Sequence, residues 1–385
     1  MDFSFNEVQE QIRDLTRQIA GDLCTPERLK QIEQSQDGLD GELWSRLARA
    51  DLLGLSIPQA FGGAALGLME TCIVLEELAL KAAAVPAWAC LVLGAHPIAR
   101  FATLAQQAEL LGSVRQGDLI VTAGLNEPGS DPALGLPLPR TTARRDGSRW
   151  RLDGEKTCVP AGMVADRILV PARLDPSSDI GVFIVDSNGS GVSRTPLRAT
   201  GGVLEAALEL DGAVVGCESV LGGSAEMGTT ILRWLIPRAT ASLCVEMAGL
   251  CEAALKLTSE YVKSREQFGR AIATFQAVSQ RAADAYVDTE AVRLTAWQAV
   301  WRLDSDLTSF ESVAIAKWWA SEAGARVVHA AQHLHGGIGV DRDYPLHRYF
   351  FAAKRIELTL GSATPQLLQL GKLMAEGPTE GRYFG

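Results

Sequence analysis

Apolar residues follow two different periods along the chain, and the change of period divides it. Spacing of three and four residues, typical of helices, recurs early in the sequence, over residues 5–24, 41–53, 68–84, 87–101 and 104–115. From about residue 118 the apolar residues come in short alternating runs, such as 150–153 and 168–170, separated by Gly, Pro and Asp. These patterns predict a helical N-terminal domain over residues 1–117 and a middle β domain over residues 118–224.

Much longer amphipathic stretches occupy the rest of the chain. The helical period is sustained over residues 229–263, 272–304, 308–334 and 363–375. Long helices of this kind bury their apolar stripes against one another in bundles. We therefore predict a C-terminal four-helix bundle over residues 225–385, and an α+β fold that is mainly α.

Composition narrows the class of protein. A chain of 385 residues with 47% apolar residues can bury a sizeable core and predicts two or three substructures. It carries 36 basic and 46 acidic residues, a formal net charge of −10, which argues against a nucleic acid or an anionic membrane surface as partner. An anionic ligand must therefore be bound by local arginines.

Cysteine usage and targeting signals favour the cytoplasm. The seven cysteines form no C-x-x-C pair and are odd in number, which fits a reducing compartment better than a disulfide framework. The N-terminus lacks the profile of a signal peptide, and the most apolar run, residues 82–99, is interrupted by Pro86, His96 and Pro97. The histidines show no metal-ligand spacing. We predict a soluble cytoplasmic protein without a metal site.

One junction between two helical stretches stands out for its chemistry. Residues 261–276 place Arg265, a Phe268-Gly269 turn and a Phe275-Gln276 pair between the helices. An arginine at such a corner is suited to bind a phosphate, because its planar fork donates two hydrogen bonds and its charge does not titrate. The alternative is that Arg265 only extends along the surface of the helix end, as arginines commonly do.

The junction resembles the R-x-x-F-G…Q signature of the acyl-CoA dehydrogenase flavoproteins, in which the arginine reaches the FAD pyrophosphate of a neighbouring subunit. Further segments resemble that family's motifs in the same order. They are residues 58–67 (P-x-x-[YF]-G-G), residues 126–131 (a shortened T-E-P-G-x-G-S-D flavin loop), and residues 335–339 with 343–345 (H-G-G-x-G…Y-P). The resemblance implies FAD as cofactor, an acyl-CoA thioester as substrate, and a fold with a helical N-domain, a β-barrel-like middle domain and a C-terminal four-helix bundle.

The resemblance also implies which residues bind FAD. The positions that match the family's cofactor contacts are Arg265, Phe268, Phe275, Gln276, His333, His335, Gly336 and Gly337, with weaker matches at Asn126, Ser130, Cys158 and Pro160. Among them, His333 stands where the family usually has a glutamine. Gly336 and Gly337 most simply allow a tight turn or the close approach of a backbone.

The family's catalytic base is missing from both places where members carry it. An acyl-CoA dehydrogenase removes an α-proton with a carboxylate, which needs a raised pKa and hydrogen-bond reach to the substrate. Where the common pattern reads …[IL]-Y-E-G-[TS], residues 358–362 read Leu-Thr-Leu-Gly-Ser, so Leu360 replaces the glutamate. In members with the base on the long helix after the β domain, the matching residue is Ala239. Neither side chain accepts a proton.

Glu246 is the nearest internal candidate for a base. It lies two helical turns beyond Ala239, on roughly the same face, within an apolar stripe that includes Met247. A buried glutamate is costly unless it is paired or neutral, so the alternative is that Glu246 pairs with an arginine across the bundle. Glu252 and Glu357 are weaker candidates, which we expect to be solvated.

Several residues that contact the flavin ring in the family are also replaced in this chain. Asn126 stands where the family usually has threonine, and two residues are missing after Gly129. Residues 158–160 read Cys-Val-Pro in place of W-[IV]-[TS], so both the ring-shielding tryptophan and the hydroxyl near flavin N5 are absent. Proline has no N–H to donate instead. The chain therefore resembles a subunit that completes a neighbour's FAD site but is poorly equipped to run its own.

This asymmetry leads to several hypotheses. The first is that the chain is the subunit without the catalytic glutamate in an α2β2 acyl-CoA dehydrogenase, with a second dehydrogenase-like subunit and an electron-transfer flavoprotein as electron acceptor. Residues 339–350 resemble those of members that act on bulky CoA thioesters, notably steroid side chains. The alternatives are a self-sufficient homotetramer that uses Glu246, a non-catalytic structural or CoA-binding subunit, and a flavin oxidase or monooxygenase on this fold.

Overall fold

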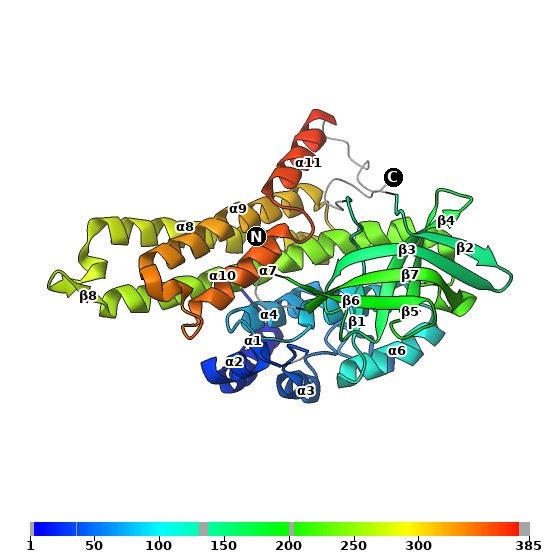
Figure 1. The fold of residues 1–385 in the computed structure, drawn as a ribbon, viewed down its shortest axis with the longest axis horizontal. Coiled ribbons are helices and arrows are strands. Elements are labelled where there is room, and N and C mark those ends of the chain that lie inside the picture. Colours follow the sequence, from blue (N-terminus) through cyan, green and yellow to red (C-terminus); the bar gives the residue numbers. More distant parts are fainter. Residues whose placement is uncertain (1–3, 36, 131–137, 200–203, 377–385) are drawn as a thin grey trace.

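The structure, a computed structural model, describes residues 4–35, 37–130, 138–199 and 204–376. The N-terminal helices lie beneath, the sheet lies at the right, and the long C-terminal helices extend to the left (Figure 1). This mainly helical architecture with one large sheet confirms the predicted fold class. The domain boundaries near residues 117 and 224 stay a prediction.

Capping residues define where several N-terminal helices begin. These elements are α1 (Glu7–Leu23), α2 (Pro26–Glu33), α3 (Gly41–Arg49), η1 (Gln59–Phe61), α4 (Leu68–Ala79), η2 (Trp88–Ala95), α5 (His96–Phe101) and α6 (Leu104–Gln116). Asn6 and Thr103 each form a capping box, in which the cap side chain and the third helical residue exchange hydrogen bonds. The predicted helix over 87–101 is present, with π-helical geometry in its first half, η2. Helix α2 was not predicted.

The sheet follows α6 and, within the described residues, has seven strands. They are β1 (Val121–Ala123), β2 (Thr142–Asp146), β3 (Arg149–Val159), β4 (Arg167–Asp175), β5 (Ile180–Asp186), β6 (Val192–Arg198) and β7 (Leu204–Gly216). Their order is β1-β4-β2-β3-β7-β6, with β5 paired to β4, and β4 runs parallel to both β1 and β2. The next long helix starts against β5 so closely that a Cβ at Gly228 would lie 2.2 Å from the Ile180 carbonyl oxygen. Only glycine fits there.

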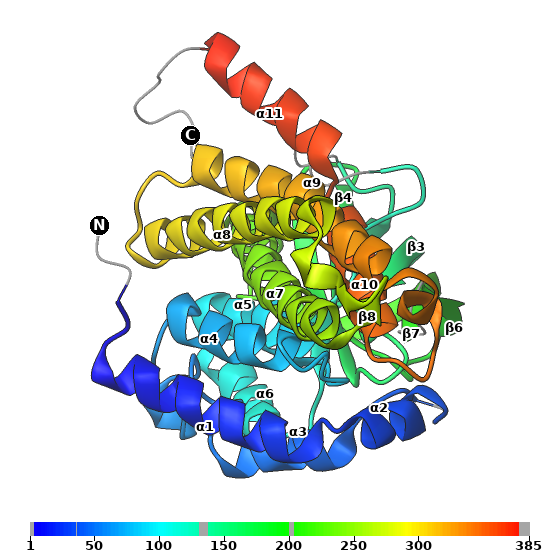
Figure 2. The same cartoon turned by 90° about the vertical axis from the view of Figure 1, so that its left-hand side faces the viewer.

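The C-terminal helices form a bundle that contains the four predicted helices and one more. The helices are α7 (Gly228–Ser264), α8 (Gln276–Asp304), α9 (Phe310–His335), α10 (Leu346–Leu358) and α11 (Ala363–Glu376). Helix α10, which was not predicted, packs against both α7 and α9 and buries Leu346, Ala353 and Ile356. Helix α11 contacts α9 and projects from the body (Figure 2). The helix predicted over residues 363–375 is therefore present as α11, and α10 is a further helix that packs on the bundle.

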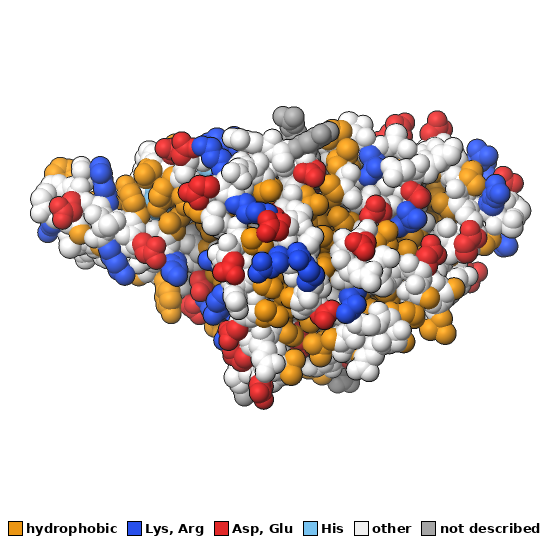
Figure 3. Space-filling view, turned by 90° about the horizontal axis from the view of Figure 1, so that it is seen from below, with side chains coloured by type: hydrophobic (Ala, Val, Ile, Leu, Met, Phe, Trp, Pro, Cys, Tyr) orange, Lys and Arg blue, Asp and Glu red, His pale blue; other side chains and the backbone are white. Residues whose placement is uncertain are grey.

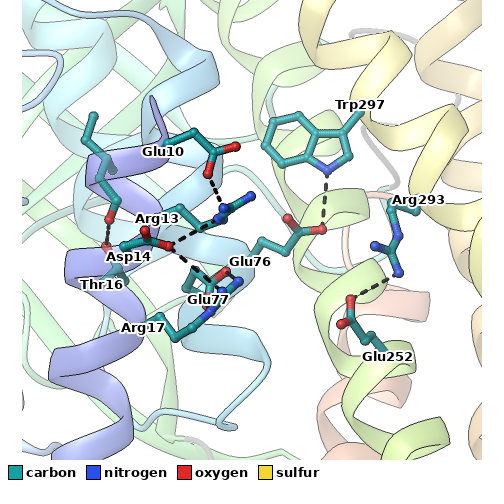
Figure 4. A network of polar contacts seen from close by, with 11 residues as sticks. Glu10, Arg13, Asp14, Thr16, Arg17, Glu76, Glu77, Glu252, Arg293 and Trp297 are labelled. Atoms are coloured by element: carbon teal, nitrogen blue, oxygen red, sulfur yellow. Dashed lines mark hydrogen bonds and ion pairs between the residues drawn. The ribbon is translucent and has the colours of Figure 1, made fainter. Parts of the chain in front are cut away.

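A polar network ties the N-terminal helices to the bundle through α4 (Figure 4). Glu77 of α4 accepts a hydrogen bond from Arg17 of α1 at 2.7 Å, and the neighbouring Glu76 accepts one from the indole of Trp297 on α8 at 3.3 Å. In the same network Arg293 of α8 lies 3.0 Å from Glu252 of α7. Glu252 is therefore an ion-paired residue at the helix surface, where the sequence predicts a solvated one.

The surface carries both signs of charge close together. Basic and acidic side chains are interspersed over the face seen in Figure 3, with apolar side chains between them. Such a mixed face gives no broad field of one sign that would attract a polyanion. Over the ranges that the structure covers, none of the helices has an apolar stretch long enough to cross a bilayer.

Candidate functional site

The turn between α7 and α8 presents several of the predicted cofactor residues. After α7 ends at Ser264, the chain forms a two-stranded hairpin of β8 (Glu266–Gln267) and β9 (Arg270–Ala271), and α8 begins at Gln276. We call residues 265–276 the tip. It lies at the far left of Figure 1, at the opposite end of the molecule from the sheet.

The side chains of the tip face outward. Arg265 is exposed, and among the described residues its side chain has no partner. Phe268 is 93% exposed and has a positive φ of 54°. Its ring lies edge-on to Phe275, with centroids 6.1 Å apart, and the Arg270 guanidinium lies 4.2 Å above the Phe275 ring. The tip thus offers a free cation and an aromatic surface to something outside this chain.

The end of α9 lies beside the last turn of α7. Tyr261, one turn before Arg265, stacks on His335 with ring centroids 4.5 Å apart. Both ring nitrogens of His335 are used within the chain, since one lies 2.8 Å from the Ala331 carbonyl oxygen and the other 3.0 Å from the Tyr344 hydroxyl. Burial lowers the pKa of His335, so the ring is held neutral. Its geometry is that of a residue that supports this corner, and its contact with a cofactor stays a prediction.

Three further predicted residues at this corner are exposed, namely His333, Gly336 and Gly337. Gly336 ends α9 with a positive φ of 64°. A Cβ added at Gly336 or at Gly337 would meet no atom within 4 Å. No close contact within the described part of this chain therefore excludes a side chain at either position. The bare backbone leaves room for close approach by a ligand or another chain.

Residues 126–130, which the sequence predicts to be the chain's own flavin loop, follow β1 of the sheet. Glu127 is buried there and accepts hydrogen bonds from Lys156 Nζ at 2.5 Å and Thr141 Oγ1 at 2.6 Å. Burial acts to raise the pKa of Glu127, but the Lys156 charge and these hydrogen bonds hold it below its ordinary value. The Ser130 hydroxyl lies 3.1 Å from the Glu127 carbonyl oxygen and closes the turn. Asp131, which ends the motif, lies outside the described residues.

The residues predicted to face a flavin ring offer few hydrogen-bond donors. The Asn126 carbonyl oxygen accepts a hydrogen bond from the Thr157 amide at 3.0 Å, which joins the loop to β3. Cys158 is exposed with a positive φ of 49°, and partial desolvation raises the pKa of its thiol. Pro160 is partly buried and has no N–H. The fold therefore places these residues together but gives them no hydroxyl at the expected position.

A cavity of about 240 Å³ opens where the N-terminal helices, the sheet and the bundle meet. Its lining includes Trp88, Pro160, Glu205, Glu246, Leu250 and Arg355. The Trp88 indole donates hydrogen bonds to the Ala239 carbonyl oxygen at 3.2 Å and to Ser242 Oγ at 3.0 Å, which fixes this wall against α7. We call this space the central cavity.

Glu246 lies buried at the wall of the central cavity. Burial raises its pKa to about 7, and the charge of Arg355 opposes that rise. The two side chains are 3.5 Å apart, so the predicted pairing with an arginine across the bundle is present but long. Glu205 also has a raised pKa because of burial. Glu357 is partly buried and lies 2.6 Å from Lys354 Nζ, so it is paired and not solvated as predicted.

The two positions that the sequence matches to the family's base are both buried and apolar. Leu360 is 4% exposed, with a positive φ of 56°, in the link between α10 and α11. The buried Lys317 holds the preceding turn, since its Nζ donates to the carbonyl oxygens of Ile356 at 2.5 Å and Glu357 at 3.2 Å. Ala239 is fully buried. Neither place holds a group that takes a proton.

Sequence reasoning missed the basic residues of the central cavity. His347, Arg348 and Arg355 all lie on α10, whose existence was not predicted. Their spacing could have indicated a shared position, because Arg348 and Arg355 are seven residues apart and hence lie on one face of a helix. Recognition of that helix would have placed both arginines on its buried side.

The fold is that of an acyl-CoA dehydrogenase. Residues 6–118 match the family described as acyl-CoA dehydrogenase, N-terminal domain, and residues 226–375 match acyl-CoA dehydrogenase, C-terminal domain. The chain belongs to this family, whose members are FAD-dependent oxidoreductases acting on CH–CH bonds.

Particular relatives cover nearly the whole chain. Acyl-CoA dehydrogenase FadE27 of Mycobacterium tuberculosis is 40% identical over 98% of this chain and 100% of the relative. A chain in the crystal structure of the ChsE4-ChsE5 complex from Mycobacterium tuberculosis is 39% identical, with a TM-score of 0.91 over 98% of this chain and 100% of that one. A chain in a variant of the Tcur3481-Tcur3483 steroid ACAD is 41% identical, with a TM-score of 0.88 over 96% of this chain and 98% of that one.

Proposed function

We propose that this chain is the subunit without a catalytic base in an α2β2 acyl-CoA dehydrogenase. In this proposal its tip completes an FAD site whose ring-binding loop and catalytic carboxylate come from a second, dehydrogenase-like subunit. The observation that carries the proposal is that the two positions expected to match the family's base hold buried apolar side chains, Leu360 and Ala239. The tip also lies at the far end of the molecule from the sheet, to which the chain's own flavin loop is attached. One chain does not bring the two halves of an FAD site together.

The residues of the tip and the adjoining corner fit the diphosphate and adenosine parts of FAD. Arg265 is a free cation, and a planar guanidinium binds a pyrophosphate with two hydrogen bonds. Phe268 and Gln276 would line the adenosine side, where an exposed ring can stack on a base. Gly336 and Gly337 leave the backbone accessible. When bound, FAD supplies the hydride acceptor of the reaction.

Substrate and electron acceptor follow from similarity. The related chains come from structures of the ChsE4-ChsE5 complex and of a steroid ACAD. This supports a bulky thioester, with a steroid side chain as its acyl part, as the substrate of the assembled enzyme. An electron-transfer flavoprotein would accept the electrons, and the cytoplasm is the expected location.

One observation favours a second candidate, a self-sufficient homotetramer. Glu246 is a buried carboxylate with a pKa near 7 at the wall of a cavity, and such a pKa suits a general base. Glu246→Gln separates the two proposals. If the partner supplies the base, the substitution leaves the turnover of the complex unchanged, whereas a homotetramer that uses Glu246 loses nearly all activity.

The decisive test is the flavin content of the chain purified alone and after co-expression with an adjacent dehydrogenase-like gene. We expect one FAD per unlike pair in the complex and little FAD in the chain alone. A yellow homotetramer that oxidises an acyl-CoA would overturn the proposal. A complex without flavin would favour a structural or CoA-binding subunit, and rapid reoxidation of reduced flavin by oxygen would favour an oxidase or monooxygenase.

A further inference from the structure

A buried lysine of α9 holds the end of α10. Lys317 is 0% exposed, and its Nζ donates to the carbonyl oxygens of Ile356 at 2.5 Å and Glu357 at 3.2 Å. The last four carbonyl groups of a helix have no partner within that helix, and a cation at this end also suits the helix dipole. Ser321, one turn further along α9, donates to the same Glu357 carbonyl oxygen at 3.3 Å. Helix α9 thus supplies hydrogen-bond partners for the last turn of α10.

The link between α10 and α11 is held at both of its ends. Thr359 donates to the Arg355 carbonyl oxygen, from its amide at 3.0 Å and from its hydroxyl at 2.8 Å. Leu360 and Gly361 have positive φ values of 56° and 89°, which turn the chain sharply between the two helices. Gln366 of α11 is 6% exposed and donates to the Leu360 carbonyl oxygen at 3.2 Å. These hydrogen bonds together fix the direction in which α11 leaves the link.

A fully buried amine at the end of a helix carries a cost. Its charge loses hydration, and only the acceptors around it offset that loss. At an exposed position, water can satisfy the end of a helix without such a cost. In several proteins a buried charge is kept because it specifies one geometry. Here the geometry that follows from the buried amine is the direction of α11.

Helix α11 contacts α9 along one face and leaves apolar side chains exposed on another (Figure 2). Gln366 and Leu373 are seven residues apart, and they are 6% and 5% exposed. Leu367, Leu368 and Met374 are 49%, 62% and 72% exposed. A helix that is held in one direction presents such side chains in one place, and a preformed surface loses less entropy when it binds.

The start of α11 lies close to the corner that is proposed to meet the second subunit. Ala363 and Thr364 share a surface depression with Ser321 and His329 of α9. His329 lies about one turn before His333, which belongs to the exposed corner at the end of α9. The surface of α11 therefore continues the one proposed to bind the cofactor at the subunit boundary. This continuity makes the second subunit the expected occupant.

We propose that Lys317 is a positioning residue, which holds the end of α10 so that α11 presents its exposed apolar side chains to the second subunit in a preformed arrangement. This inference rests on the proposed function, because that function supplies the second subunit. It goes beyond that function by giving a buried lysine of α9 a part in assembly.

The first test is hydrogen exchange of the purified full chain, which needs no partner. Lys317→Met removes the amine and keeps an unbranched side chain of similar length, and replacement of a buried charge by an apolar side chain need not weaken a fold. We expect the amides of α11 to exchange at least about tenfold faster in this variant, with those of α7 unchanged. Unchanged exchange in α11 would overturn the proposal.

Two further variants make this test decisive. Ser321→Ala removes the second donor to the Glu357 carbonyl oxygen, so it should also speed exchange in α11 and serves if Lys317→Met does not fold. Thr289→Val is the matched control, because it removes a buried hydroxyl of α8 that donates to the Ala285 carbonyl oxygen at 2.8 Å. It should leave exchange in α11 unchanged. Equal exchange in α11 for Ser321→Ala and Thr289→Val would count against the proposal.

The second test is assembly with the co-expressed second subunit, measured by analytical ultracentrifugation. Lys317→Met should weaken the complex at least about tenfold, and Thr289→Val should leave it intact. A merely structural role would lower the melting temperature of the chain without changing the dissociation constant of the folded complex, and that result would overturn the proposal. If the natural chain binds no second subunit, the proposed function fails and the assembly role fails with it. The exchange result then tells that failure apart from a link that Lys317 does not hold.

Discussion

Arg265 is a side chain whose proposed role can be separated from the stability of the chain. It is exposed and has no partner among the described residues, so its removal costs the isolated chain little. We predict that Arg265→Gln weakens FAD binding by the complex about 10- to 100-fold, because charge-assisted hydrogen bonds are each worth about 1.5–3 kcal/mol. Flavin absorbance after gel filtration measures the loss. Arg49→Gln, an exposed arginine on α3, is the matched control, and unchanged flavin in the Arg265 variant would contradict the prediction.

Leu360 is part of the buried core, so a glutamate at this position should lower the stability of the fold. This position is 4% exposed, so a carboxylate there would lose its hydration when charged. Its pKa would therefore lie above the value in the unfolded chain. The penalty is absent below the unfolded pKa and grows as the pH rises towards the folded one. We predict that Leu360→Glu lowers the melting temperature more at pH 8 than at pH 5, whereas Leu360→Gln lowers it equally at both. An equal loss for Leu360→Glu would mean that water reaches the site.

The sequence predicts which residues lie close together where the signal is local. Arg265 and Gln276 belong to one short motif, and the structure places both at one exposed turn. Glu205, Glu246 and Arg355 come from three distant segments, and only the packing of the sheet against α7 and α10 brings them to one cavity. No spacing along the chain reports that proximity, so this group could not be predicted.

Helix α4 packs against both α1 and the bundle, and the partly buried acid Glu76 lies where they meet. Burial raises the pKa of Glu76 to about 7, although the Trp297 indole donates to it (Figure 4). An acid with a raised folded pKa costs nothing below its unfolded pKa, and the cost grows as the pH rises to about 7. We predict that Glu76→Gln gains up to about 3 kcal/mol of unfolding free energy relative to the natural chain between pH 5 and pH 8. Denaturant unfolding across this range measures it, and a pH-independent difference would contradict the burial argument.

The hydrophobic patterns of α2 and α10 explain why the sequence did not predict these two helices. Helix α2 is short and polar, and within it only Leu29 is buried, so it shows no stripe. In α10 the aromatic run Tyr349, Phe350 and Phe351 interrupts the period that Leu346 and Ile356 would otherwise define. Long helices such as α7 were predicted within a few residues because their period repeats many times. Short elements depend on tertiary contacts that the pattern does not contain.

The arrangement of the whole chain indicates that its surfaces are completed by another subunit. The tip lies at the far end of the molecule from the sheet, and α11 projects from the bundle with contacts to α9 (Figures 1 and 2). An isolated helix of 14 residues is marginal in water. It leaves Leu367, Leu368 and Met374 exposed at 49%, 62% and 72%. Apolar residues on a projecting helix are typical of a surface that a partner covers.

We therefore predict that α11 contributes to assembly with the second subunit. Leu368→Ser combined with Met374→Ser should leave the unfolding free energy of the isolated chain nearly unchanged, because both side chains are already in water. The same pair should weaken the complex at least about tenfold, since each leucine-sized side chain buried at an interface is worth about 1.5–3 kcal/mol. Analytical ultracentrifugation of the co-expressed subunits measures the dissociation. Leu104→Ser, a leucine of α6 that is 77% exposed, is the control that should leave assembly intact. If both variants assemble equally well, α11 is not part of the interface and the partner must cover another face.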